Sequence, residues 1–172
     1  MLKTIKDNQI ENVIFLAGDS HSSWVTDVIP KESINDTAIY DPSTGRGAVA
    51  VEFGGTAISS PPSFGRNLTS EAYNKAAQRL VTVNRPLHYA ETQYRGYYTL
   101  HLSSERAMAT FWATPNITTE GHESFALARF EVESGQNKLS RPINGGKKPA
   151  SGAIQAEVVK YDRQKWNGTA FA

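Results

Sequence analysis

The sequence contains no cysteine among its 172 residues. A disulfide framework and a thiolate metal site are therefore both excluded, although the absence does not fix the compartment. An excess of charge of one sign is also lacking, because 18 basic and 17 acidic side chains leave a net charge of +1. Such a chain has no long-range field that would draw it to nucleic acid or to an anionic membrane.

Long apolar runs are missing as well. No stretch approaches the roughly 20 residues that a membrane span requires, and residues 1–12 contain no signal-peptide core. Leu2, Ile5 and Ile10 instead follow near-helical spacing, so residues 1–12 read as the last turns of a helix. Because a domain rarely starts in this way, we expect the chain to begin in the middle of a larger fold.

The composition that is present favours a folded protein, with 39% hydrophobic and 20% charged residues. A chain of this length buries about two-thirds of its unfolded surface. We therefore expect one domain over residues 1–172, with a weakly patterned and loose tail at 162–172.

Hydrophobic periodicity predicts one strong helix over residues 68–83, capped by Thr69 or Ser70. Residues 87–93 read as a loop or a short extended piece, and 25–29 as a strand or a turn. The remaining strands are predicted at residues 13–17, 48–53, 97–103, 107–113, 125–134 and 153–161. Four to six mostly antiparallel strands with one main helix indicate an α/β fold of the α+β kind, resembling half of a layered sandwich.

The most informative stretch follows the first predicted strand, which we expect to be buried. There Gly18 precedes Asp19 and His21, with Ser20 between them. A carboxylate and an imidazole two residues apart can hold a cation at the carboxyl end of a strand. Equally, Asp19 could cap a turn and His21 could form a local hydrogen bond.

Three stretches taken together resemble a known family. They are FLAGDSHSSW at residues 15–24, VAVEFGGTAISSP at residues 49–61, and Asn84 followed at a set interval by Arg95-Gly96-Tyr97. Their order resembles the C-terminal part of the PhoD-like alkaline phosphatases and phosphodiesterases, a branch of the metallophosphoesterase superfamily. The resemblance runs from about Val13 to Trp112.

The resemblance implies the C-terminal half of an αββα sandwich and a multinuclear centre of iron and calcium. It also implies hydrolysis of phosphomonoesters and phosphodiesters, and export to the periplasm or the cell exterior. Asp19 and His21 would be metal ligands, and Ser20, Asn84 and Arg95 would contact the substrate. Arg95 could bind phosphate through its fork of donors, or form a structural salt bridge instead.

Two features separate this sequence from the family pattern. The family's earlier metal ligands lie several hundred residues upstream, and Pro86 stands where the family often has histidine, with His88 two positions later. Of the other histidines, we expect His101 to pack against its strand and His122 to be exposed in a loop.

These observations leave two hypotheses. In the first, the chain is part of a metal-dependent phosphatase and is inactive without an N-terminal lobe. In the second, it is a non-catalytic, truncated or degenerate remnant that serves as a binding or oligomerisation module. Half of a sandwich exposes a sheet face and a strand edge, which favours association with an N-terminal lobe or a second copy.

Overall fold

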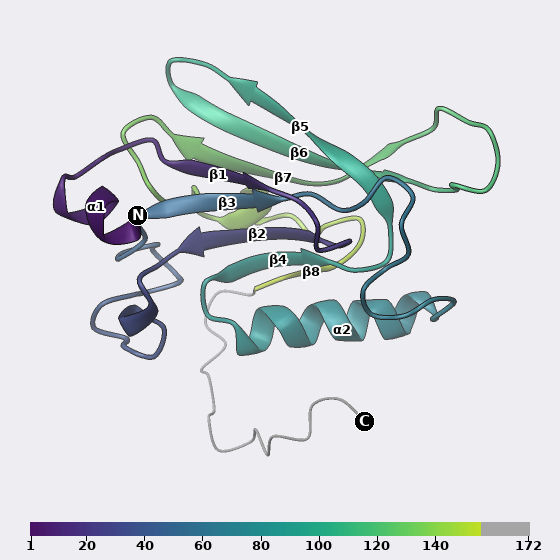
Figure 1. Cartoon of the computed structure of the whole chain (residues 1–172), viewed down its shortest axis with the longest axis horizontal. Coiled ribbons are helices and arrows are strands. Elements are labelled where there is room, and N and C mark those ends of the chain that lie inside the picture. The colour runs from purple at the N-terminus through teal and green to yellow at the C-terminus, as the bar shows by residue number, and fades with distance from the viewer. Residues whose placement is uncertain (156–172) are drawn as a thin grey trace.

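The computed structural model describes residues 1–155, in which eight strands form two sheets that pack face to face (Figure 1). The five-stranded sheet has the order β1-β3-β2-β4-β8 and consists of Ile14–Ala17, Ala50–Gly54, Ser23–Val28, Leu87–Glu91 and Ala153–Ile154 in that order. The three-stranded sheet has the order β5-β6-β7 and consists of Arg95–Leu102, Arg106–Thr114 and Phe125–Glu133. Two short 3-10 helices lie at Lys31–Ser33 and Ile143–Gly146.

The main hydrophobic core lies between the two sheets. At its centre the side chain of Phe111, which is 1% exposed, contacts four aromatic rings at centroid distances between 5.2 and 6.4 Å. Phe53 and Tyr89 come from the five-stranded sheet, and Tyr98 and Phe130 come from the three-stranded sheet. Burial of these large rings is the principal force that holds the sheets together.

The helix α2 (Ser70–Val83) covers the other face of the five-stranded sheet (Figure 1). It begins at Thr69, whose hydroxyl accepts a hydrogen bond from the backbone N–H of Ala72 at 3.2 Å. Its buried stripe consists of Tyr73, Ala77 and Val81. The predicted helix and its cap are confirmed, and the short helix α1 (Leu2–Asp7) confirms the helical reading of the N-terminal residues.

The expectation of a buried first strand is wrong. Among residues 1–155 the strand β1 pairs, in parallel, with β3 alone, so it lies at the edge of the described sheet, and Leu16 is 58% exposed. An apolar run occurs in edge strands as well as central ones, so the run alone did not distinguish the two positions.

Of the two alternatives for residues 87–93, the structure confirms the short extended piece, whereas one histidine differs from the expectation. Residues 87–91 form the strand β4 between β2 and β8, and four of its five residues are buried because the second sheet and α2 cover its two faces. His101 is exposed rather than packed, because it lies on the outer face of β5. His122 is exposed in a loop, as expected. Of the strand predicted at 153–161, residues 153–154 form β8, and the remainder lies beyond the described residues together with the tail at 162–172.

The predicted fold class is confirmed as a mixed α/β arrangement with mostly antiparallel strands and one main helix. The pair β1 and β3 is the one parallel pairing among residues 1–155. In this part of the chain, none of the helices is both long enough and apolar enough to cross a membrane.

Candidate functional site

The loop that follows β1 is held in an uncommon backbone conformation. Asp19 has a φ of 69° and His21 a φ of 53°, both in the left-handed region that residues with a side chain seldom adopt. Ser20 lies between them, and its backbone N–H donates to the carbonyl of Gly18 at 2.9 Å. Such strain persists only where neighbouring contacts impose it, and it concentrates at functional sites.

The contacts that impose this conformation involve Ser20. Its hydroxyl donates to the carbonyl of Ser22 at 2.9 Å and accepts a hydrogen bond from the indole N–H of Trp24. Its own carbonyl accepts a hydrogen bond from the hydroxyl of Ser63. The loop is therefore fixed both by its own side chain and by a segment more than 40 residues away in the sequence.

The imidazole of His21 is oriented by a single backbone group. Its Nδ1 lies 3.0 Å from the carbonyl oxygen of Pro61. A carbonyl oxygen only accepts hydrogen bonds, so Nδ1 carries the proton and donates it. In the neutral ring Nε2 then carries the lone pair, which is the form that binds a metal ion.

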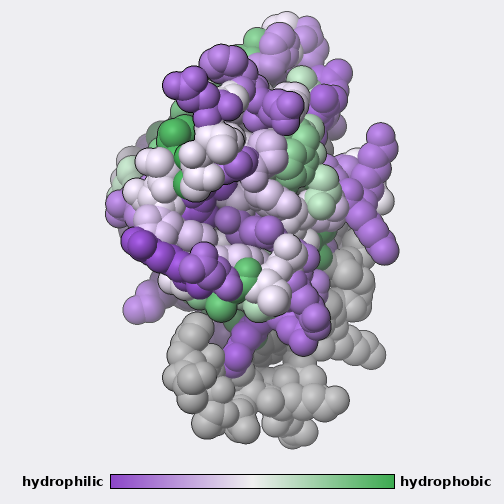
Figure 2. Space-filling view, turned by 90° about the vertical axis from the view of Figure 1, so that its right-hand side faces the viewer, coloured by the Kyte–Doolittle hydropathy of each residue, from purple (hydrophilic) through white to green (hydrophobic). Residues whose placement is uncertain are grey.

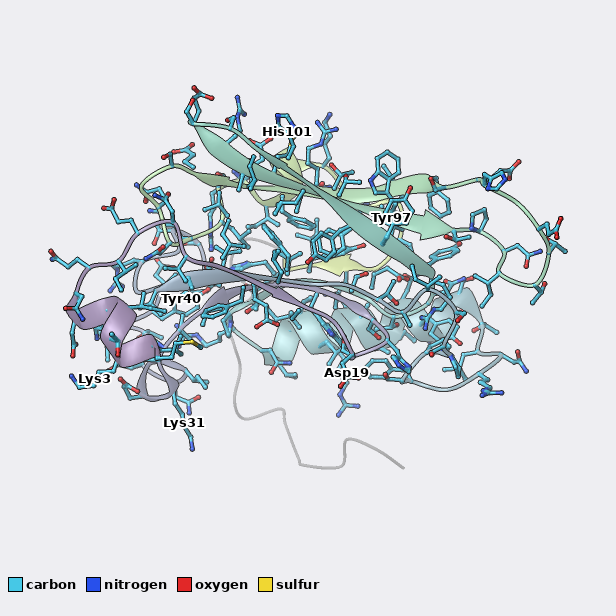
Figure 3. The ribbon with its side chains drawn as sticks, turned by 45° about the horizontal axis from the view of Figure 1, so that its top comes forward. Lys3, Asp19, Lys31, Tyr40, Tyr97 and His101 are labelled. Carbon is cyan, nitrogen blue, oxygen red and sulfur yellow. The ribbon has the colours of Figure 1, made fainter. Side chains whose placement is uncertain are left out.

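The carboxylate of Asp19 is exposed, in the loop at the lower surface of the view in Figure 3. Within residues 1–155 it has no hydrogen-bond donor and no basic partner. The same residues contain no group of three or more histidine, aspartate or glutamate side chains that could hold a metal ion. Asp19 and His21 are therefore suited to be part of a metal site that needs further ligands.

Arg95 lies on the same side of the molecule as this loop, but its side chain is only 4% exposed. One terminal nitrogen, Nη1, donates to the carbonyl of Ser60 at 2.6 Å, and the other, Nη2, donates to the carbonyl of Gln93 at 3.3 Å. Burial lowers the pKa of the guanidinium, and the negative charge of Glu91 partly opposes that effect. The side chain of Arg95 is thus used to hold two backbone carbonyls.

A cavity of about 550 Å³ is lined in part by Pro61, the residue whose carbonyl orients His21. Its polar and charged lining residues include Arg66, Asn67, Gln93, Arg95 and Thr118, and Pro61 lies on its wall. The right-hand end of Figure 1 faces the viewer in Figure 2, where hydrophilic residues predominate and apolar residues form small separate patches.

The structure does not bring Asn84 to this loop. Asn84 caps the C-terminal end of α2, and its amide donates to the carbonyl of Leu80 at 2.9 Å. The neighbouring strand β4 pairs with β2 from Leu87 opposite Thr26 to Glu91 opposite Ser23. The loop of Ser20 and His21 continues from one end of this strand pair. Asn84 lies beyond the other end.

The sequence reading missed a buried polar network at that opposite end. One carboxylate oxygen of Asp27 accepts hydrogen bonds from the hydroxyl of Tyr40 at 2.9 Å, from Nη2 of Arg141, and from Nε2 of His88 at 3.0 Å. The other accepts from the backbone N–H of Leu139 at 3.0 Å. Burial alone would raise the pKa of Asp27, but the hydrogen bonds and charges of His88 and Arg141 outweigh burial and lower it.

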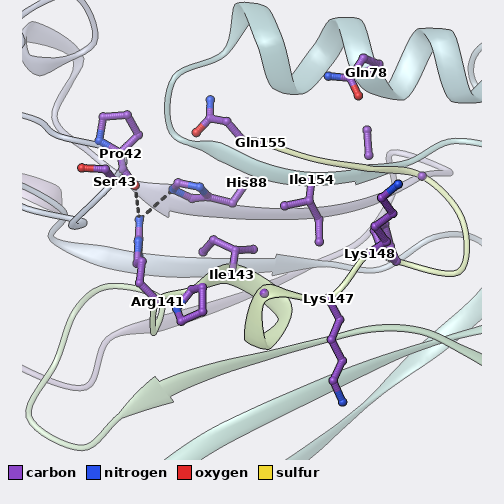
Figure 4. Close-up of a pocket in the computed structure, with 15 residues that line it drawn as sticks. Pro42, Ser43, Gln78, His88, Arg141, Ile143, Lys147, Lys148, Ile154 and Gln155 are labelled. Carbon is purple, nitrogen blue, oxygen red and sulfur yellow. Dashed lines mark hydrogen bonds between the residues drawn. The ribbon is translucent and has the colours of Figure 1, made fainter. Parts of the chain in front are cut away.

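A second cavity, of about 690 Å³, borders this network (Figure 4). At the edge of this cavity, Nη2 of Arg141 lies 3.0 Å from Nε2 of His88 and 3.0 Å from the carbonyl oxygen of Pro42. The sequence held one signal for the network, because Asp27 lies two residues after the buried Val25 in a strand and must therefore face the same side.

Comparison with known proteins decides the family. The family model described as PhoD-like phosphatase matches residues 1–111, well over half of the chain. The chain belongs to the PhoD-like phosphatase family. No curated protein matches it. The family match begins at the first residue, ahead of the expected start near Val13, and ends next to Trp112 as expected.

A solved structure titled "Structure of PhoD" has the same fold. The match has a TM-score of 0.61 and 23% sequence identity, and it covers 95% of this chain. This chain spans only 28% of the length of that one. The matched part reaches beyond residue 111, so the three-stranded sheet also belongs to the shared fold.

Proposed function

We propose that this chain supplies part of the metal site of a phosphatase or phosphodiesterase that hydrolyses phosphate esters. Asp19 and His21 act as metal ligands, and iron and calcium are the metals that the family resemblance implies. The chain is then the later part of a larger metallophosphatase domain, and the location implied by the family is outside the cytoplasm. Substrate contacts from Ser20 and Arg95 remain predictions, and we propose none from Asn84, which lies at the opposite end of the sheet.

The observation that carries this proposal is the hydrogen bond from Nδ1 of His21 to the carbonyl of Pro61. Histidines that bind metals generally donate their other ring N–H to a carbonyl or carboxylate, which fixes the ring and makes the ligating nitrogen more basic. The unpartnered carboxylate of Asp19 and the left-handed backbone of both residues support the same conclusion.

Cations held in the complete site would supply Lewis-acid chemistry, which would polarise a phosphoryl group and lower the pKa of a bound water molecule. This chain's contribution is to hold one side of the cation site through Asp19 and the Nε2 atom of His21. The hydrogen bonds of Ser20 keep the loop in that arrangement. Two ligands are fewer than the three protein ligands typical of a catalytic metal site, so the N-terminal lobe must supply the rest.

The test is reconstitution with an N-terminal lobe from the family, in the presence of calcium and iron. Hydrolysis of a phosphomonoester and a phosphodiester is measured for the mixture and for each part alone. We expect activity only in the mixture, with large losses for Asp19→Ala and His21→Ala. His122→Ala, which removes an exposed loop histidine, is the matched control and should retain activity. An inactive mixture, together with unchanged metal binding by Asp19→Ala, would refute the proposal.

The second candidate is a non-catalytic module, and the exposed edge of β1 is the observation that favours it. This edge, which no other described strand pairs with, and the 58% exposed Leu16 offer a surface for strand addition. A phosphatase lobe would occupy that edge in the first proposal, and a second copy of this chain would occupy it here. Light scattering of the chain alone separates the two candidates. A homodimer would support the non-catalytic module, and a monomer would exclude it.

A further inference from the structure

Residues 56–63, named here the bridging segment, connect the His21 loop to the strand that begins with Arg95. At one end the hydroxyl of Thr56 donates to the carbonyl of Tyr94 at 3.2 Å, and the N–H of Gly96 donates to the carbonyl of Ala57 at 3.2 Å. At the other end Pro61 accepts the hydrogen bond from His21. The segment has no regular secondary structure, so side chains and neighbouring backbone must hold it.

Arg95 holds the middle of the bridging segment. Its Nη1 donates to the carbonyl of Ser60 at 2.6 Å, directly before the proline whose carbonyl receives the His21 proton. Desolvating a guanidinium is costly, and within the described part of the chain none of the hydrogen bonds of Arg95 goes to a carboxylate. A cation buried at such a cost to hold a backbone carbonyl indicates that the position of this carbonyl matters.

The sequence of the bridging segment makes it stiff at this point. Residues 59–62 read Ser-Ser-Pro-Pro, so Ser60 and Pro61 each precede a proline and are restricted to extended conformations. The ring of Pro61 also fixes its φ. Because little rotation remains between the two carbonyls, moving the carbonyl of Ser60 moves the carbonyl of Pro61 with it.

We propose that Arg95 is a positioning residue for His21, acting through the carbonyls of Ser60 and Pro61. By fixing the first carbonyl it keeps the second within reach of Nδ1, and so keeps the proton on Nδ1 and the lone pair on Nε2. This inference rests on the proposed role of His21 as a metal ligand. It assigns a role to the segment whose sequence contributed to the family resemblance.

The buried side chain of Glu91 holds the turn that leads into Arg95. Its side chain is 1% exposed, and its carboxylate accepts hydrogen bonds from the backbone N–H groups of Gln93 at 2.8 Å and Tyr94 at 3.0 Å. These hydrogen bonds shape the turn between β4 and β5, and Arg95 is the first residue after that turn. Burial raises the pKa of Glu91, and the two backbone hydrogen bonds oppose that rise.

The experiment measures the His21 ring itself in the complete chain, labelled with ¹⁵N. Long-range ¹⁵N–¹H NMR reports which ring nitrogen carries the proton, and a titration with Zn²⁺ reports binding at Nε2. In the wild-type chain we expect a proton on Nδ1 and a shift of Nε2 with Zn²⁺. Arg95→Gln should mix the two tautomers and weaken Zn²⁺ binding by about 10- to 100-fold, the usual effect of losing a group that orients a metal ligand.

Arg85→Gln is the matched control. Arg85 also holds two backbone carbonyls, those of Ile34 at 2.8 Å and Tyr40 at 2.6 Å, but at the opposite end of the sheet. It should leave the His21 tautomer and Zn²⁺ binding unchanged. Arg95→Lys keeps the charge but loses the fork of donors, so it should recover only part of the binding.

A second variant tests the same inference in case Arg95→Gln does not fold. Pro61→Gly keeps every side chain of the network and removes the stiffness between the two carbonyls, so it should change the tautomer in the same direction as Arg95→Gln. The inference is overturned if a folded Arg95→Gln or Pro61→Gly keeps the wild-type tautomer and Zn²⁺ affinity. If instead Zn²⁺ does not shift Nε2 in the wild-type chain, the proposed metal role of His21 fails, while the tautomers still test the positioning role.

Discussion

Replacing Asp27 with asparagine should cause a large loss of stability at neutral pH. Its carboxylate is completely buried and accepts hydrogen bonds from Tyr40, His88, Leu139 and Arg141. Asparagine has the same shape but no charge, and its amide group places a donor where the carboxylate accepts. The side chain of Arg141, only 14% exposed, would lose its counter-ion. Breaking a buried ion pair on one side typically costs about 3–5 kcal/mol.

That cost should be visible in thermal unfolding. For a chain of this size, each kcal/mol lowers the melting temperature by roughly 2–4 °C, so Asp27→Asn should melt about 6–20 °C below the wild type at pH 7. Glu120→Gln, which neutralises an exposed carboxylate in a loop, is the control and should melt within about 1–2 °C of it.

The pH dependence provides the stronger test of the reasoning. The pKa of Asp27 is lowered in the folded protein, so its contribution to stability is complete above the ordinary pKa of 3.8. That contribution is lost as the pH falls below this value and through the folded pKa. Asparagine does not titrate, so the gap between the variant and the wild type should be widest at pH 7 and should narrow below about pH 4. A gap that stays constant down to pH 3 would show that shape, and not charge, accounts for the loss.

Three further substitutions test the packing and the backbone. Phe111→Ala should lower the free energy of unfolding by about 3–5 kcal/mol in urea titration, because it empties the centre of the core between the sheets. Thr69→Ala should cost about 1 kcal/mol in the same assay, because it removes the acceptor for the N–H of Ala72 at the start of α2. Gly96→Ala should abolish folding, seen as loss of near-ultraviolet circular dichroism, because the new methyl carbon would lie 2.0 Å from the carbonyl oxygen of Trp112. Unchanged stability in any of the three would contradict the corresponding contact.

The sequence was most informative where burial is one-sided. The helix α2 buries one stripe of residues, and the hairpin of β5 and β6 alternates between the core and solvent. Both patterns have the period of their element, so the helix and the hairpin could be predicted from the sequence. In each case the element's own residues carry enough of the information.

The strand β4 could not be predicted with the same certainty, because it is covered on both faces. Its sequence, Leu87 to Glu91, places histidine and glutamate at buried positions. Those polar groups are stable there only because partners elsewhere satisfy them, and the carboxylate partner of His88 is Asp27, 61 residues away. Partners more than 60 residues away leave no periodic pattern in the strand itself.

The candidate site shows the same division between local and distant information. Asp19 and His21 could be predicted as candidate ligands because two ligand types two residues apart form a local pattern. The group that orients His21 is the carbonyl of Pro61, 40 residues away. Every residue has a backbone carbonyl, so the residue type at position 61 gives no sign that this one is an acceptor. Only the fold reveals it.

The two ends of β2 differ in how far their polar groups are satisfied. At one end the charge of Asp27 is matched by Arg141, and its two oxygens are fully occupied by donors of this chain. At the other end Asp19 has no partner within residues 1–155, and the hydrogen bond of His21 leaves Nε2 available. A satisfied network has no need of further groups, whereas a strained loop with an unused carboxylate and an oriented imidazole gains stability when a cation binds. The loop after β1, and not the more extensive buried network, is therefore the part of this chain that we propose to contact the metal and the remainder of its site.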